Sequence, residues 1–289
     1  MNVAFMFGLF ICLFPTLLGQ GKDRVGLYIL YPSNLLCIKL ICANQWPLVE
    51  FELNDFRVAL PKIKDVQTFI MDPPYNIDFD YKSKYKDNLN PDEYKQTIKE
   101  VLDIAYNVSK DSASFFMINY PEVTAELYST IKETKWNTHQ WITWVYNSNF
   151  GFSSKRFTKA SRAILWMVKE EPKIKINAVV QPYKNLNDHR IQKQLAKGKK
   201  GCNLYNWWDI NICKFNAKEK LDYVNQIPFK LLSRLILTTT DNGDLVVDPM
   251  CGSGSALVAA DNLEREAWGC DINENLKPIW DNILAQTRV

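Results

Sequence analysis

The sequence predicts an α/β fold in which a mostly parallel β-sheet is covered by helices. From about residue 48, short β-rich runs alternate with amphipathic helical patterns. The run 66–71 is apolar without interruption, as strands buried on both faces of a parallel sheet are. Residues 244–263 read as a strand, a tight Gly-x-Gly turn and a helix. These three observations together favour strands joined by helical crossovers.

The first part of the domain alternates regularly. Residues 92–109 follow Asn90-Pro91, carry acids in the first turn and keep apolar side chains on one face, as a covering helix does. A polar loop, 147–162, separates two later strands. In chain order the predicted elements are strands 48–53 and 66–71, helix 92–109, strand 113–119, helix 122–133, and strands 140–146 and 163–168.

The alternation stops at residues 169–222, which are basic and polar with aromatic insertions such as "CNLYNWWDI". We therefore expect an insertion here that lies outside the sheet. The βα pattern then returns to the end of the chain. Its predicted elements are helix 227–239, strand 244–248, helix 255–263, strand 267–271 and a last helix at 275–286.

The N-terminal residues 1–45 form an apolar extension. Residues 3–19 carry no charge and have the length of the apolar part of a signal peptide, but no Lys or Arg precedes them and Pro15 interrupts them. Three interpretations stay open: export or anchoring, a non-native or poorly ordered extension, and extra packing onto the domain. No residue of this segment is a catalytic candidate.

The cysteine content and the charge distribution limit the kinds of site and partner that we expect. The seven Cys include no CxxC pair and only two His are present, so we expect neither a disulfide framework nor a metal site, and the free thiols suit a reducing compartment. Residues 154–220 hold 16 Lys and Arg against 5 Asp and Glu, a local charge of +11, while the remainder carries −8. A polyanion partner at this basic segment is one interpretation, and a solvated lysine-rich loop is the other.

The glycine turn suggests a cofactor. Gly252 and Gly254 permit close approach of a ligand to the backbone at the start of a helix. The next strand ends at Asp271, whose carboxylate is placed to accept hydrogen bonds from ribose hydroxyls. The pyrophosphate fingerprint is incomplete, because Leu257 occupies the position of its third glycine. Glycine turn and acid therefore indicate a nucleoside-containing cofactor.

The stretch "DPPY" at 72–75 suggests the reacting group. An acid held by two rigid prolines beside an aromatic ring suits a planar base that carries an exocyclic amine. Asp72 would accept a hydrogen bond from the amine and a backbone carbonyl of the loop would accept the second, which makes the nitrogen lone pair available. Tyr75 can stack on the base, which must leave its duplex to reach the site.

The two motifs in this order, "DPPY" first and "DPMCGSG" far downstream, resemble the β-class DNA amino-methyltransferases. The similarity extends over about residues 46–287 and includes "SSKRFTKASRAILWMVK" and "NQIPFKLLSRLI". The resemblance implies a circularly permuted, Rossmann-like methyltransferase sheet with helices on both faces and a basic target-recognition insertion. The glycine loop departs from the usual pattern, since Met250 stands where Phe is usual.

The resemblance also assigns domains and residues. Residues 46–168 would be the catalytic half, 169–222 the target-recognition insertion and 223–289 the cofactor-binding half. Strand 48–53 would fill the sheet position beside strand 267–271. The implied catalytic residues are Asp72, Pro73, Pro74 and Tyr75, and the S-adenosylmethionine-binding residues are Asp248, Pro249, Gly252, Ser253, Gly254, Asp271, Ile272 and Asp55. Expected DNA-binding residues are Lys155, Arg156, Lys184, Arg190, Lys193, Lys197, Lys199 and Lys200.

The implied reaction is methyl transfer from S-adenosyl-L-methionine to the N6 amine of an adenine flipped out of double-stranded DNA. Asp rather than Ser at position 72 favours adenine over the alternative, cytosine N4. A catalytically silent nucleic-acid-binding methyltransferase subunit is a third hypothesis, and RNA stays open as a substrate. No metal and no membrane partner are expected, a homodimer is compatible with the sequence, and the expected location is intracellular, in the cytoplasm or nucleus.

Overall fold

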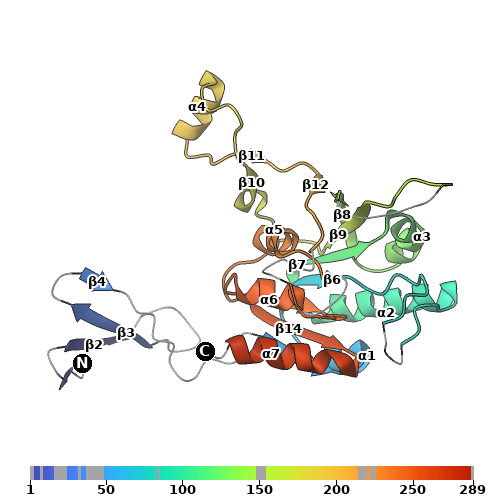
Figure 1. Cartoon of the computed structure of the whole chain (residues 1–289), viewed down its shortest axis with the longest axis horizontal. Coiled ribbons are helices and arrows are strands. Elements are labelled where there is room, and N and C mark those ends of the chain that lie inside the picture. Colours follow the sequence, from blue (N-terminus) through green and yellow to red (C-terminus); the bar gives the residue numbers. More distant parts are fainter. Residues whose placement is uncertain are drawn as a thin grey trace. The chain divides into compact units, whose positions relative to one another are not determined.

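The computed structural model describes residues 3–6, 9–15, 25–31, 34–36, 49–81, 83, 85–147, 154–213, 220–221 and 226–287 (Figure 1). The chain divides into two compact units, Met1–Pro47 and Leu48–Val289. The first contains an antiparallel sheet of β1 (Val3–Met6), β2 (Leu9–Pro15), β3 (Val25–Tyr31) and β4 (Asn34–Leu36). Among the described residues, no helix combines the length and the apolar character needed to cross a bilayer. The three interpretations of this segment stay predictions.

The second unit is built on an eight-stranded sheet. Its strand order is β12-β8-β9-β7-β6-β13-β14-β5. β9 runs antiparallel to both of its neighbours, and the other described pairs in this sheet are parallel. The strands are β5 (Val49–Leu53), β6 (Val66–Met71), β7 (Ser109–Asn119), β8 (Asn137–Val145), β9 (Ser161–Val168), β12 (Trp207–Asp209), β13 (Leu245–Asp248) and β14 (Glu266–Asp271).

Helices cover both faces of this sheet, as expected, and each face has its own apolar cluster. One cluster contains residues of α5 (Phe229–Thr239), α6 (Ser255–Asp261) and α7 (Lys277–Thr287). The other contains residues of α1 (Phe56–Ala59), the adjoining 3₁₀ turn η1 (Leu60–Lys62), α2 (Pro91–Val108) and α3 (Pro121–Lys132). The sheet is therefore buried on both sides, which explains why β6 has no polar alternation.

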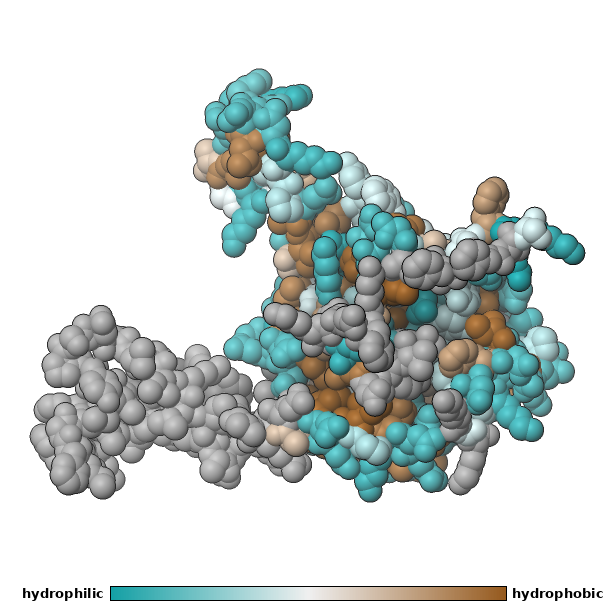
Figure 2. Space-filling model, in the orientation of Figure 1, coloured by the Kyte–Doolittle hydropathy of each residue, from teal (hydrophilic) through white to brown (hydrophobic). Residues whose placement is uncertain are grey.

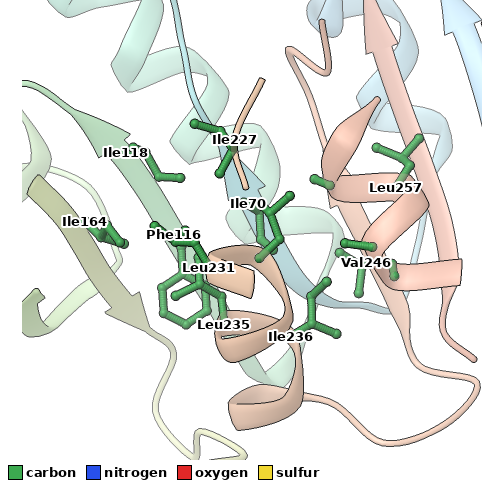
Figure 3. Packing of buried hydrophobic residues seen from close by; sticks show 14 of the residues in the cluster. Ile70, Phe116, Ile118, Ile164, Ile227, Leu231, Leu235, Ile236, Val246 and Leu257 are labelled. Atoms are coloured by element: carbon green, nitrogen blue, oxygen red, sulfur yellow. The ribbon is translucent and has the colours of Figure 1, made fainter. Parts of the chain in front are cut away.

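Helix α5 packs its apolar face onto the centre of the sheet (Figure 3). The helix begins after Pro228, whose fixed φ suits the residue before a helix. Leu231, Leu235 and Ile236 are at most 1% exposed and lie in one cluster with Ile70 of β6. Each such leucine contributes about 1.5–3 kcal/mol by leaving water. This burial fixes α5 across β6 and β7.

The predicted elements are present within one to four residues, and strand 48–53 indeed occupies the position beside β14. The expectation that 169–222 lies outside the sheet is wrong for one part. Residues Trp207–Asp209 form β12, which pairs in parallel with β8 at the sheet edge. A strand of three residues is too short to show a periodicity, so the sequence pattern did not indicate it. Its central residue, Trp208, is buried and donates to the Tyr205 carbonyl.

Much of the insertion before β12 forms an arm. It contains η2 (Ile176–Ala178), a short hairpin of β10 (Val180–Gln181) with β11 (Cys202–Asn203), and α4 (His189–Ala196) near its end (Figure 1). Backbone hydrogen bonds from Lys169 to Ala113 and from Lys173 to Ser112 fasten its base near the amino end of β7. Figure 2 shows a mainly hydrophilic surface at the end of this arm, with an apolar patch beside it.

The carboxyl ends of the central strands meet at one edge. From β6 the chain continues to one side of the sheet through β7, and from β13 it continues to the other through β14. Between β6 and β13 the connections therefore diverge, and such a switch point leaves a crevice above the strand ends. The residues after β6 are 72–75, and those after β13 are the glycine turn.

Gly254 holds the glycine turn against the outer strand. It has φ +81°, and a Cβ placed there would lie 2.5 Å from Cε1 of Phe51. Phe51 of β5 stacks on Trp280 of α7 with ring centroids 4.9 Å apart, and the Trp280 indole N–H donates to the Gly252 carbonyl at 2.9 Å. Phe51 therefore has little room to move away.

Replacing this glycine should cost more than its backbone conformation alone. Gly243 has nearly the same φ, +79°, but a Cβ there meets nothing within 4 Å. We expect Gly243→Ala to lower the free energy of unfolding by about 1–2 kcal/mol, the cost of the left-handed conformation. Gly254→Ala should lower it by about 1–3 kcal/mol more, because Phe51 must shift. Urea denaturation of both variants tests this, and equal losses would contradict it.

Candidate active site

The acid at the end of β6 is held by two side chains. The Tyr75 hydroxyl donates to Oδ1 of Asp72, and a terminal nitrogen of Arg162 lies 3.5 Å from its Oδ2. Tyr75 is 7% exposed, and its ring packs edge-on against Tyr120 at 4.9 Å. Both oxygens of Asp72 therefore have a fixed direction before any substrate enters.

The second proline of the motif is anchored from α2. The Tyr94 hydroxyl donates to the Pro74 carbonyl at 2.8 Å, and the Asn119 amide donates to the same hydroxyl at 3.2 Å. Both Tyr94 and Asn119 are buried. The Tyr94 hydroxyl occupies one of the two lone pairs of the Pro74 carbonyl, so we expect the neighbouring Pro73 carbonyl to serve a substrate.

A buried carboxylate shapes the chain after the motif. Asp87, 2% exposed, accepts from the backbone N–H groups of Asn76 at 2.8 Å and of Ile77 and Phe79 at 3.1 Å. Its own carbonyl accepts from Asp78 at 2.6 Å. Asn76 and Asp78 both have positive φ, near +60°, which these bonds hold in place. The aromatic residues that follow are thus kept at the rim of the site.

The glycine turn after β13 is tied to the end of β14. Oδ2 of Asp271 accepts from the Gly252 N–H at 3.0 Å, and its Oδ1 accepts from the Asn273 N–H at 2.9 Å. Oδ1 of Asp248 accepts from the Met250 N–H at 3.1 Å. Each carboxylate oxygen has a further lone pair, so Asp271 can still accept from ribose hydroxyls.

These two strand ends line one cavity of about 520 Å³. It brings together residues from both halves of the sequence, which parallel pairing of β6 with β13 places side by side. The predicted site residues that line it are Asp55, Asp72, Pro73, Pro74, Tyr75, Asp248, Pro249, Gly252, Ser253, Asp271 and Ile272. Gly254 is not among its lining residues and is instead the N-cap residue of α6. Asp55 caps α1 by accepting from the Arg57 N–H, and the two side chains form an ion pair at 3.1 Å.

The cavity is electronegative; Asp248 is buried, and Asp72 and Asp271 are partly buried. Burial raises the pKa of Asp248 well above its ordinary value, and the neighbouring Asp72 and Asp271 raise it further. Burial also raises the pKa of Asp271, against the backbone donors that stabilise its charge. For Asp72, burial raises the pKa while the Arg162 guanidinium acts in the opposite direction. Such a cavity favours a cationic ligand, which would compensate the desolvated carboxylates.

Sequence reasoning missed Arg162, Tyr94, Asn119 and Asp87. The sequence pattern could have indicated Arg162, because it is the lone charged residue at the start of an otherwise apolar strand. Only the antiparallel direction of β9 brings that start to the carboxyl ends of its neighbours. Asp87 gave no signal, because a loop acid that bonds backbone N–H groups looks in sequence like any solvated acid.

The predicted DNA-binding residues lie apart from the cavity. Lys155 and Arg156 are exposed and precede β9 in the chain, whereas the others lie in the arm, on α4 or within a few residues of it. Arg190 pairs with Asp188, the residue that caps α4, at 2.8 Å. No lining residue of the cavity comes from the described part of 169–222. The role of all eight residues stays a prediction.

The burial of Asp248 has a consequence for stability. Its folded-state pKa is raised, so the folded state binds a proton more readily than the unfolded chain, and stability falls as the pH rises from the unfolded to the folded pKa. Asp248→Asn removes the buried charge and keeps an oxygen for the Met250 N–H. We expect a higher free energy of unfolding for the ligand-free variant at alkaline pH, and a gain that shrinks toward acid pH.

Urea denaturation from about pH 4 to about pH 9 measures this difference. Asp281→Asn, the same substitution at an exposed position of α7, is the control and should change stability by less than about 0.5 kcal/mol. A variant at Asp248 that is less stable than the parent at every pH would contradict the expectation.

Known proteins resemble this chain in sequence. The type II methyltransferase M.HpaI of Haemophilus parainfluenzae is 27% identical over 215 residues, which cover 72% of this chain and 65% of that protein. The DNA adenine methyltransferase YhdJ of Escherichia coli strain K12 is 26% identical over 244 residues, 76% of this chain and 77% of that protein. The chain spans 64% of M.BglII of Bacillus subtilis and 50% of M.BamHI of Bacillus amyloliquefaciens, so it matches only part of several relatives.

Solved structures share the fold. The M1.HpyAVI–SAM complex superposes with a TM-score of 0.60 at 18% identity and covers 82% of this chain and 98% of that one. The PvuII DNA methyltransferase, named as cytosine-N4-specific, gives a TM-score of 0.60 at 18% identity over 84% of this chain and 96% of that one. The predicted α/β methyltransferase fold is thereby confirmed. A family model described as N6_N4_Mtase, DNA methylase, matches residues 66–281, and the chain therefore belongs to this family.

Proposed function

We propose that this protein is a DNA adenine-N6 methyltransferase that uses S-adenosyl-L-methionine and acts on an adenine flipped out of double-stranded DNA. One observation carries the proposal: the Asp72 corner and the glycine turn at 248–255 line the same cavity of about 520 Å³. That volume suits a nucleoside cofactor with a base beside it. If the two motifs had opened onto separate surfaces, the proposal would have been contradicted.

The residues of the cavity fit the cofactor. S-adenosyl-L-methionine supplies an electrophilic methyl group on a sulfonium, and it also carries an ammonium group. Asp271 would accept from its ribose hydroxyls, and Ile272, 47% exposed, offers an apolar surface beside them. Asp248 would face its positive charge, which offsets the cost of burying that acid.

The Asp72 corner suits the target amine. Oδ2 of Asp72 can accept one amine hydrogen, and the Pro73 carbonyl can accept the other. Two acceptors at these positions favour a pyramidal nitrogen whose lone pair is free to attack the methyl carbon. As the carbon–sulfur bond breaks, its electron pair stays on sulfur, and the nitrogen then loses a proton. Asp72 can receive that proton or pass it to solvent.

Cytosine N4 is the alternative target, since its exocyclic amine fits the same corner. The similar proteins include one named as an adenine methyltransferase and one named as cytosine-N4-specific. Asp rather than Ser at position 72 supports adenine. A catalytically silent DNA-binding subunit would not need the bonds that fasten Asp72 and Asp271, so these bonds support an active enzyme.

Nucleoside mass spectrometry would decide between the targets. The protein is incubated with isotope-labelled cofactor and separate DNA and RNA oligonucleotides, which are then digested to nucleosides. We expect labelled N6-methyl-2′-deoxyadenosine from DNA and no label in RNA. Labelled N4-methyl-2′-deoxycytidine would instead support the cytosine alternative, and absence of label from every substrate would support the silent subunit.

Asp72→Ala should abolish methyl transfer, because the amine loses its acceptor, while cofactor affinity changes less than tenfold. Asp271→Ala should act mainly on cofactor binding and reduce cofactor affinity by about tenfold or more. Calorimetric titration of cofactor and a single-turnover transfer assay separate the two effects. Transfer by Asp72→Ala at a substantial fraction of the parental rate would rule out the assigned role.

Lysines of the arm should contribute to DNA binding. Removing two of them with Lys193→Gln and Lys197→Gln should weaken binding and reduce the slope of log K against log salt by up to about 1 for each lysine. The matched control, Lys64→Gln with Lys135→Gln, removes two exposed lysines near the amino end of the sheet. Fluorescence anisotropy over a salt series measures both, and equal slopes would place the DNA elsewhere.

A further inference from the structure

Arg162 is a buried cation that contacts the catalytic corner and is absent from both motifs. It is the second residue of β9, and its register partner is Trp144 of β8. Its side chain is 11% exposed and lines the cavity. Among the described residues, its Nε has no hydrogen-bond partner although it is buried. A charged group in this setting must be compensated by its surroundings.

Two kinds of neighbour compensate it. The carboxylate of Asp72 lies 3.5 Å from the guanidinium, and three aromatic rings surround it. The central carbon of the guanidinium is 5.2 Å from the ring centroid of Tyr75, 5.3 Å from that of Trp144 and 5.9 Å from that of Tyr120. Cation–π attraction to these rings gives the flat guanidinium a fixed orientation. Arg162 therefore holds the Asp72 carboxylate from a fixed position on β9.

The chemistry proposed above requires Asp72 as an acceptor, and a protonated carboxyl would lose one acceptor oxygen. Burial by itself favours the protonated form. A second acid, Asp248, lies on the opposite side of Asp72 from β9, and the charge of Asp72 raises its pKa. The Tyr75 hydroxyl donates to Asp72, but a neutral donor opposes the effect of burial less strongly than a cation does.

We propose that Arg162 is a positioning residue that keeps Asp72 in its carboxylate form and fixes its orientation for the target amine. This inference rests on the proposed function. Arg162 acts through Asp72 and need not touch either substrate. A lysine would keep the charge but lose the flat surface that lies among the rings, so charge and geometry can be separated by substitution.

The pH dependence of transfer tests the inference. The other titratable or charged groups that face this pair are Tyr75 beside Asp72, Tyr94 of α2, Tyr120 after β7, Tyr146 after β8 and Asp248 of β13. Burial raises the pKa of Tyr75, Tyr94 and Tyr146, so these hydroxyls stay protonated over the range of the experiment. Asp248 is the second acid, and repeating the measurement in Asp248→Asn removes its contribution.

The rate of single-turnover transfer at saturating cofactor and DNA should fall toward acid pH as Asp72 becomes protonated. We call this part of the pH–rate profile the acid limb. In Arg162→Gln this limb should move upward by roughly 1–3 pH units, because the carboxyl loses its cationic neighbour. At pH values below the limbs of both proteins, the transfer rate of Arg162→Gln should be about tenfold lower than the parent's for each pH unit by which the limb moves. Above both limbs, its rate should be within a few-fold of the parent's. Arg162→Lys should move the limb by less than about 1 pH unit.

Lys159→Gln is the matched control. Lys159 also lies over the Tyr120 ring, at 4.7 Å, and pairs with Glu122, so its removal takes one cation from the same ring while the ion pair of Arg162 with Asp72 stays in place. Its acid limb should coincide with the parent's. A limb that moves as far in Lys159→Gln as in Arg162→Gln would mean a general charge effect and would overturn the inference.

Three further outcomes would also overturn it. Arg162→Gln could slow transfer by one factor at every pH, which indicates a structural role only. It could weaken DNA binding with an unmoved limb, which would make Arg162 a DNA-binding residue. If Arg162→Gln does not fold, a limb displaced by more than about 1 pH unit in folded Arg162→Lys would count against the inference. Absence of transfer by the parent protein to every substrate would remove the proposed function itself, so the two failures are distinguishable.

Discussion

The site depends on the parallel pairing of β6 with β13. These strands are far apart in the chain, and their register brings Asp72 and Asp248 to the same edge of the sheet. Helix α5 packs on the centre of the sheet with its apolar face, so the pairing is held by burial as well as by backbone hydrogen bonds. Because connections diverge on the two sides of this pair, the space above it stays open for ligands.

The cavity keeps several carboxylates out of water, which destabilises the ligand-free protein. Asp248 and Asp271 have backbone donors but no cation among their described partners, whereas Asp72 has Arg162. This difference follows the chemistry proposed for each acid. A cationic cofactor can compensate the first two, but the target base is neutral, and Asp72 therefore needs a cation supplied by the fold.

How much of this could be read from sequence depends on how local each signal is. Strand 66–71 is an uninterrupted apolar run, the helices 92–109 and 227–239 have apolar faces that extend over several turns, and all three elements are present. β12 consists of three residues, and its membership in the sheet depends on pairing with β8. The Asp87 carboxylate and the Tyr94 hydroxyl bond backbone groups that are 8 to 20 positions away in the chain, which leaves no spacing to recognise.

The sequence by itself determined the kind and order of the elements, the two motifs and the acids that end the strands. Hydrophobic periodicity and proline and glycine geometry are local properties, so they can be read without coordinates. Only the tertiary structure decided that both motifs open into one cavity and that Arg162 lies against Asp72. Those facts depend on strand register and on the reversed direction of β9, and both are set by the packing of segments that are distant in the chain.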